Sequence, residues 1–183
     1  MAKVNKNMMA IGLIVAVVVI AGAVFFIGKS GGPLSSSAPY MSQDQAQSLF
    51  GAGGVYNYSV ATNATAVSNL LGLMQAPSMF TNNVTAAWKV EYVNNTTHTS
   101  MLELILQMNN ARAQSFYKQI TNLSIQELSM DNATASGMVY SAKRLPDTAA
   151  IIGYKNSDLV FVLMNDSSIN IQSVASVVAS DMP

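Results

Sequence analysis

The chain has no cysteine and only one histidine, His98. Without cysteine it cannot form disulfide bonds, use a thiolate nucleophile or build a cysteine-ligated metal or iron–sulfur site. A single histidine also excludes every metal site that needs two histidine ligands. We therefore expect no bound metal and no cofactor.

Charged side chains are also scarce. The 183 residues include 9 lysines and arginines and 9 aspartates and glutamates, which is 10% of the chain, and the formal net charge is zero. Globular proteins usually carry about 25% charged residues. Nine scattered cations do not form the dense basic surface that binds phosphate backbones, so we predict no nucleic acid partner.

Recognised catalytic motifs are missing too. The sequence has no G-x-S-x-G, Walker, H-E-x-x-H or dinucleotide-binding pattern, and we interpret the glycine-rich stretch 51–54 as a helix stop. The three glutamates are Glu91, Glu103 and Glu127, and the first two fall on neighbouring predicted strands. We expect them to lie on a solvated face, and we expect His98 to lie in an exposed loop. We therefore predict no catalytic, cofactor-binding or metal-binding residue, and no enzyme.

One long apolar run is present, from Met8 to Ile27. Twenty helical residues span about 30 Å, the thickness of a hydrocarbon core. Lys3 and Lys6 precede the run, and lysines on a short leading segment favour the cytoplasmic side. We predict a short cytoplasmic tail at 1–7 and a single transmembrane anchor at 8–28, with the rest of the chain outside.

Three interpretations of this apolar segment differ in whether and where it is cleaved. We favour an uncleaved signal-anchor, because a cleaved signal usually has an apolar region of about 7–15 residues. This run is longer and ends in the bulky residues 25–27. The alternatives are cleavage at the small residues 21–23 and a pilin-type leader.

A Gly/Ser/Pro-rich linker follows at 29–40, with the sequence KSGGPLSSSAPY. We predict that it separates the anchor from one extracytoplasmic domain at 41–183.

That domain is rich in N-x-S/T triplets, the acceptor motif for N-glycosylation. Eight occur, where random placement of its asparagines predicts roughly three. They begin at Asn57, Asn63, Asn83, Asn94, Asn95, Asn122, Asn132 and Asn165. We predict N-linked glycans at these sites, in agreement with the topology inferred from the lysines. Glycosylation without disulfides indicates an archaeal surface protein.

The hydrophobic periodicity predicts a mixed domain. The predicted helices cover 43–50, 67–74, 110–120 and 171–178, and the predicted strands cover 55–61, 87–93, 102–106, 125–130, 137–142, 149–154 and 159–164. Most strands are joined by short turns, which favours an α+β fold: an antiparallel sheet with several helices packed on one face.

Strands 149–154 and 159–164 form a predicted hairpin. A two-residue loop at 156–157 would place Lys155 opposite Asp158 and would align Ile152 with Phe161.

The register of the hairpin formed by strands 87–93 and 102–106 is less well determined by the sequence. If Trp88, Val90 and Tyr92 share a face with the leucines of 102–106, two registers are possible. We expect the one that places Lys89 opposite Glu103, both exposed, because opposite charges stabilise such a pair.

These features predict a non-catalytic, single-pass, membrane-anchored surface glycoprotein of the cell envelope. We expect an accessory or structural subunit of an envelope or membrane complex, in contact with the lipid bilayer through residues 8–28 and with other membrane or envelope proteins. Two alternatives stay open. An apolar amino-terminal helix before a β-rich glycosylated head resembles archaeal pilins, which implies a surface-filament subunit. The domain could also be an extracytoplasmic solute-binding or sensing domain.

Overall fold

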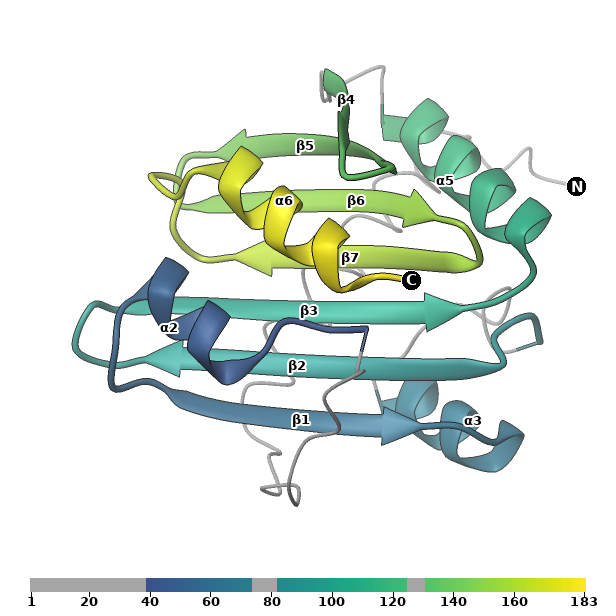
Figure 1. Ribbon diagram of the computed structural model, residues 1–183, viewed down its shortest axis with the longest axis horizontal. Helices are drawn as coiled ribbons and strands as arrows, with labels where there is room; N and C mark the ends of the chain where they lie inside the picture. The colour runs from purple at the N-terminus through teal and green to yellow at the C-terminus, as the bar shows by residue number, and fades with distance from the viewer. Residues whose placement is uncertain (1–38, 74–81, 125–130) are drawn as a thin grey trace, which may run out of the picture.

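The computed structural model describes residues 39–73, 82–124 and 131–183. Within them the chain is an α+β domain built on one seven-stranded antiparallel sheet, with strand order β1-β2-β3-β7-β6-β5-β4 (Figure 1). The strands are β1 (Val55–Ala61), β2 (Ala86–Asn94), β3 (Thr99–Gln107), β4 (Asp131–Ala135), β5 (Met138–Leu145), β6 (Thr148–Lys155) and β7 (Asp158–Met164). The helices are α2 (Gln43–Phe50), α3 (Ala64–Leu73), α5 (Asn110–Ser124) and α6 (Ile171–Asp181).

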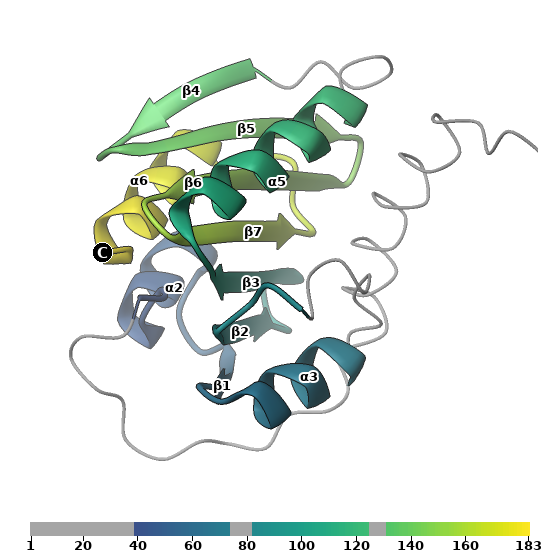
Figure 2. The same cartoon turned by 90° about the vertical axis from the view of Figure 1, so that its right-hand side faces the viewer.

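Helices cover both faces of the sheet, so the prediction of helices on one face was wrong. Figure 2 shows α2 and α6 on one side of the sheet and α3 and α5 on the other. The contacts agree: α2 touches α6 and β3, whereas α5 touches β6 and β7. Central strands are therefore buried on both faces, and their apolar pattern is nearly continuous rather than alternating.

Each face has its own hydrophobic core. The α2/α6 core includes Phe50, Ile105 and Val178, and the α3/α5 core includes Leu71 and Phe116. A fully buried side chain of this size contributes about 1.5–3 kcal/mol, so both cores stabilise the domain strongly. Four methionines with 0% exposure lie in the α2/α6 core: Met41, Met101, Met138 and Met164. Their flexible side chains fill the space between the sheet and the two helices.

Helix α2 begins and ends as predicted. Ser42 and Gln45 form a capping box, in which each side chain bonds the other residue's backbone N–H. Gly51, with φ of 90°, ends the helix. At the end of the glycine-rich stretch, Gly54 has no room for a side chain, because a Cβ there would lie 2.3 Å from Cζ of Tyr92.

The hairpin of β6 and β7 has the predicted register. Lys155 lies opposite Asp158 and Ile152 lies opposite Phe161. Asn156 adopts a left-handed φ of 52°, which a two-residue hairpin loop requires.

The predicted register of the β2–β3 hairpin was wrong by one residue. Val90 lies opposite Glu103, and Lys89 lies opposite Leu104. The four-residue turn 95–98 pairs Asn94 with Thr99, and this offset puts Lys89 and Glu103 on opposite faces of the sheet. Both side chains are buried rather than exposed. The prediction assumed one solvent-facing side, which these strands do not have.

Two further helices begin with asparagine side chains that bond their first turns. The Oδ1 atom of Asn109 accepts from the N–H of Ala111 at the start of α5. Asn170 caps α6, because its Oδ1 accepts from the Ser173 N–H. Asparagine is among the residues preferred at this position.

Among the described residues, no helix has the length and apolar character needed to cross a membrane. The predicted anchor at 8–28 and the predicted strand at 125–130 lie outside the described residues.

Candidate functional site

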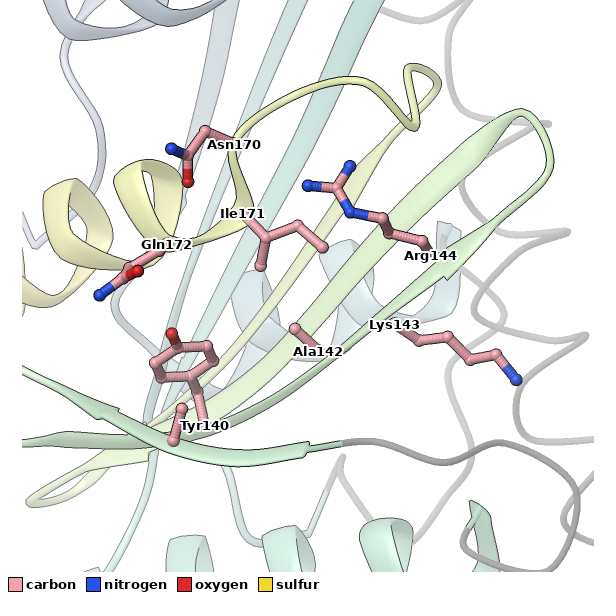
Figure 3. A pocket seen from close by; sticks show the side chains of 8 residues that line it. Tyr140, Ala142, Lys143, Arg144, Asn170, Ile171 and Gln172 are labelled. Carbon is pink, nitrogen blue, oxygen red and sulfur yellow. The ribbon is translucent and has the colours of Figure 1, made fainter.

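An open pocket lies between strand β5 and the amino-terminal end of helix α6 (Figure 3). Its volume is 490 Å³, within the range of about 300–1,000 Å³ typical of small-molecule sites. The lining residues are Ala133, Tyr140, Ala142, Lys143, Arg144, Asn170, Ile171 and Gln172. They come from β4, β5 and α6, which are brought together by the sheet order and by the docking of α6.

Side chains along β5 point alternately to the two faces of the sheet, and those on the α6 face reach the pocket. Tyr140 and Ala142 belong to the core on the α6 face, and Arg144 follows at the same period. Lys143 alternates with them, and Figure 3 shows it pointing away from α6. The pocket therefore has an apolar floor with a cation at one end.

Tyr140 supplies an unused polar group. The residue is 6% exposed, and Figure 3 shows its ring rising from β5 toward Ile171 and Gln172. Its hydroxyl makes no hydrogen bond with any described residue. The hydroxyl oxygen is not among the buried unpaired atoms of the described residues, so water can reach it from the open pocket. A ligand with a hydrogen-bonding group could take the place of that water.

Arg144 fixes the rim of the pocket. Its guanidinium donates to the carbonyl oxygens of Ser167 and Ile169, the latter at 2.7 Å, so the loop before α6 is tied to β5. Asp166 lies in the same loop. Hydrogen bonds from Ser168 lower the pKa of the Asp166 carboxyl, and the charge of Arg144 lowers it further.

The amino terminus of α6 adds a positive end. Asn170 satisfies only the N–H of Ser173, so the amides of Ile171 and Gln172 lack intrahelical acceptors. The helix dipole places partial positive charge there. Together with Arg144, this end favours a ligand that carries negative charge.

The lining residues of the pocket include no carboxylate and no histidine. Within the described residues, no three acidic or histidine side chains converge as metal ligands. Tyr140, Arg144 and Gln172 are among the polar residues that line the pocket.

The glutamates lie apart from this pocket and from each other. Glu91 shares the α3/α5 face with Lys89, and the two form an ion pair of 2.8 Å between Nζ and Oε1. Glu103 lies on the opposite face with the α2/α6 core. The expected solvated face was therefore wrong, because both glutamates are buried. Glu127 lies outside the described residues, and His98 is exposed in its loop, as predicted.

The predicted glycosylation sites differ in accessibility. Asn63, Asn95, Asn122 and Asn165 are exposed, and Asn57 and Asn83 are half-buried. Asn94 is 1% exposed. The side chain of Asn132 is not described, and its backbone belongs to edge strand β4. The exposed asparagines fit the prediction of attached glycans, whereas Asn94 in the folded domain does not.

Sequence reasoning missed the pocket residues. Tyr140 and Arg144 recur with period two on β5, which is a signal for a shared face. Nothing local connects them with Asn170 or Gln172, because α6 begins 26 residues after β5 ends. The docking of α6 over β5 is a tertiary feature.

Comparison with known proteins indicates the fold. No protein-family model matches the chain, and no curated protein matches its sequence. A solved structure does match: the extracellular domain of PknH from Mycobacterium tuberculosis, with a TM-score of 0.50 and 8% identity, over 81% of this chain and 96% of that one. At this identity the likeness concerns the arrangement of helices and strands, and this chain shares its fold with an extracellular domain.

Proposed function

We propose that the chain is a membrane-anchored surface protein whose domain binds a small ligand outside the cell, as a sensing or solute-binding domain. The observation that carries this proposal is the pocket beside α6, where the hydroxyl of Tyr140 has no partner among the described residues. The fold of the PknH extracellular domain supports it. The predicted anchor at 8–28 would hold the domain at the membrane, and the predicted glycans would mark its outer surface.

The ligand we propose is a small organic carboxylate. The apolar floor would receive its carbon skeleton, and the hydroxyl of Tyr140 would donate to one oxygen. The amides at the start of α6 would face the carboxylate, since a helix amino terminus favours anions. Arg144 would add charge without moving, because the carbonyls of Ser167 and Ile169 already hold its guanidinium.

A second candidate is the accessory subunit predicted from the sequence. The outer strand β1 favours it, because Val55 and Val60 are 57% and 47% exposed there. Apolar side chains on an edge strand suit contact with another protein. The filament-subunit alternative rests on the amino-terminal segment and stays a prediction.

A binding experiment separates the two candidates. The full chain in detergent micelles is heated with acetate, succinate or citrate in excess. A ligand that binds the folded state at 100 times its Kd stabilises it by about 2.7 kcal/mol. We expect at least one of these carboxylates to raise the midpoint of unfolding.

Two variants place the effect in the pocket. Tyr140→Phe removes the hydroxyl that faces the pocket, and we expect it to weaken binding by about 1 kcal/mol, the contribution of one hydrogen bond. Tyr154→Phe removes a hydroxyl from the opposite face of the sheet, where it contacts Gln114, and should bind as the wild type does. No shift with any of the three probes, together with stoichiometric co-purification of a membrane complex, would instead favour the accessory subunit.

A further inference from the structure

A buried carboxyl group lies where the described domain begins. Glu103, in the middle of β3, is 0% exposed. Its Oε2 accepts a hydrogen bond of 2.9 Å from the backbone N–H of Met41, just before α2. Its Oε1 is buried and accepts no hydrogen bond from the described residues. Such a position suits a protonated carboxyl, because burying a carboxylate without partners is far more costly.

A second acid lies on the same face. Asp181, the last residue of α6, accepts a hydrogen bond of 3.0 Å at Oδ1 from the amide of Gln45. This bond links α6 to α2. Its Oδ2 is buried and, like the free oxygen of Glu103, has no hydrogen-bond partner within the described residues.

The surroundings of Glu103 provide no compensating cation in the described part of the chain. Its strand partners on β2 and β7 are Val90 and Val162. The titratable groups that interact with it are Asp181 from α6, Tyr56 from β1 and Tyr40 from the segment before α2.

Lys155 and Tyr56, which lie near this face, donate hydrogen bonds to backbone oxygens. Lys155 of β6 reaches α6, but its Nζ donates to the carbonyls of Ala179 and Met182. The hydroxyl of Tyr56 donates to the carbonyl of Met41 at 2.7 Å. Met41 is therefore held on both sides, by Glu103 through its N–H and by Tyr56 through its carbonyl.

The direction of the pKa shifts of Glu103 and Asp181 agrees with this geometry. Burial raises the pKa of Glu103 from 4.5 to about 8; the hydrogen bond from Met41 opposes the rise, and the charge of Asp181 adds to it. Burial also raises the pKa of Asp181. The folded domain then keeps a proton that the unfolded chain releases above its ordinary carboxyl pKa. The stability from this proton is present in acid and is lost as the pH rises toward 8.

We propose that Glu103 and Asp181 form a proton-binding site that holds α2 and α6 against the sheet in acid and loosens them as the medium becomes alkaline. The site lies where the domain joins the linker expected at 29–40. Loss of the proton leaves a buried negative charge on Glu103 next to the charge of Asp181, and this cost falls on the place where Met41 continues toward the predicted anchor. This proton site is separate from the ligand pocket, which lies at the other end of α6.

A titration of the full chain in micelles tests the site directly. The chain has three glutamates, so selective carboxyl ¹³C labelling gives three resonances to follow. We expect one resonance to titrate near pH 8 and to be missing in Glu103→Gln. Titration of all three within about one unit of the ordinary glutamate pKa would overturn the proposal.

Unfolding at several pH values tests the consequence. Between about pH 5 and about pH 9 we expect the wild-type midpoint to fall by about 5 °C or more. Asp44→Asn removes an exposed carboxyl from α2 and should show the same fall. Glu103→Gln should show a smaller one, and an equal fall would contradict the proposal. If Glu103→Gln does not fold, the carboxyl titration of the wild-type chain tests the proposal on its own.

Hydrogen exchange tests which elements respond. After correction for the intrinsic effect of pH, the amides of α2 and α6 should exchange faster at the alkaline end, while those of α5 on the opposite face should not. Equal acceleration in all three helices would refute selective loosening.

Discussion

Replacement of Lys89 by methionine should lower the free energy of unfolding by about 3–5 kcal/mol, the usual cost of breaking a buried ion pair. The side chains of Lys89 and Glu91 are only 7% and 5% exposed, and their charged atoms lie 2.8 Å apart. Both belong to β2 and point to the α3/α5 face. Lys89→Met therefore leaves the Glu91 carboxylate buried without its partner.

A double variant separates the pair from the charge left behind. In Lys89→Met/Glu91→Leu both partners are apolar, and such replacements are often neutral or stabilising. We expect the double variant to regain most of the lost stability in denaturant unfolding of the full chain. Lys118→Met, on an exposed position of α5, should change stability by no more than about 0.5 kcal/mol. A double variant no more stable than Lys89→Met would contradict this description.

Replacement of Asn94 by aspartate should cost about 3 kcal/mol or more. The amide nitrogen of Asn94 donates toward the carbonyls of Phe50, Gly51 and Ala52 at 3.4, 3.0 and 3.0 Å. Its Oδ1 accepts from the N–H groups of Thr96 and Thr97. The carboxylate introduced by Asn94→Asp would place a negative oxygen against three carbonyl oxygens, so we expect the unfolding midpoint to fall by about 6 °C or more.

The neighbouring residue provides a matched control. Asn95→Asp makes the same change in charge at an exposed position and also removes a glycosylation triplet. It should leave the midpoint within about 2 °C of the wild type. Similar losses in the two variants would mean that the contacts of Asn94 do not stabilise the turn after α2.

Local chemistry made part of the fold predictable. The capping box of Ser42 and Gln45 and the stop at Gly51 depend on residues within one helix. The β6–β7 register depends on a two-residue turn with Lys155 and Asp158 beside it. In each case the decisive contacts are between residues close in sequence, which is where pattern and propensity are most informative.

Long-range burial made the rest unpredictable. The register of β2 and β3 was misassigned because alternation identifies a buried face only when the other face meets solvent. Here Lys89 and Glu103 are buried on opposite faces, each under different helices. The candidate pocket also depends on contacts between residues far apart in the sequence, since Tyr140 and Gln172 meet only when α6 docks on β5. The glycosylation motif is local, but the burial of Asn94 depends on the turn after α2.

Site-resolved glycopeptide mass spectrometry of the native protein tests most directly whether this domain lies outside the cell as a glycosylated surface domain. We predict glycan at a majority of the exposed sites Asn63, Asn95, Asn122 and Asn165, and none at Asn94, whose amide nitrogen is hydrogen-bonded and buried. Absence of glycan from every one of the eight asparagines would contradict the predicted glycosylated surface domain.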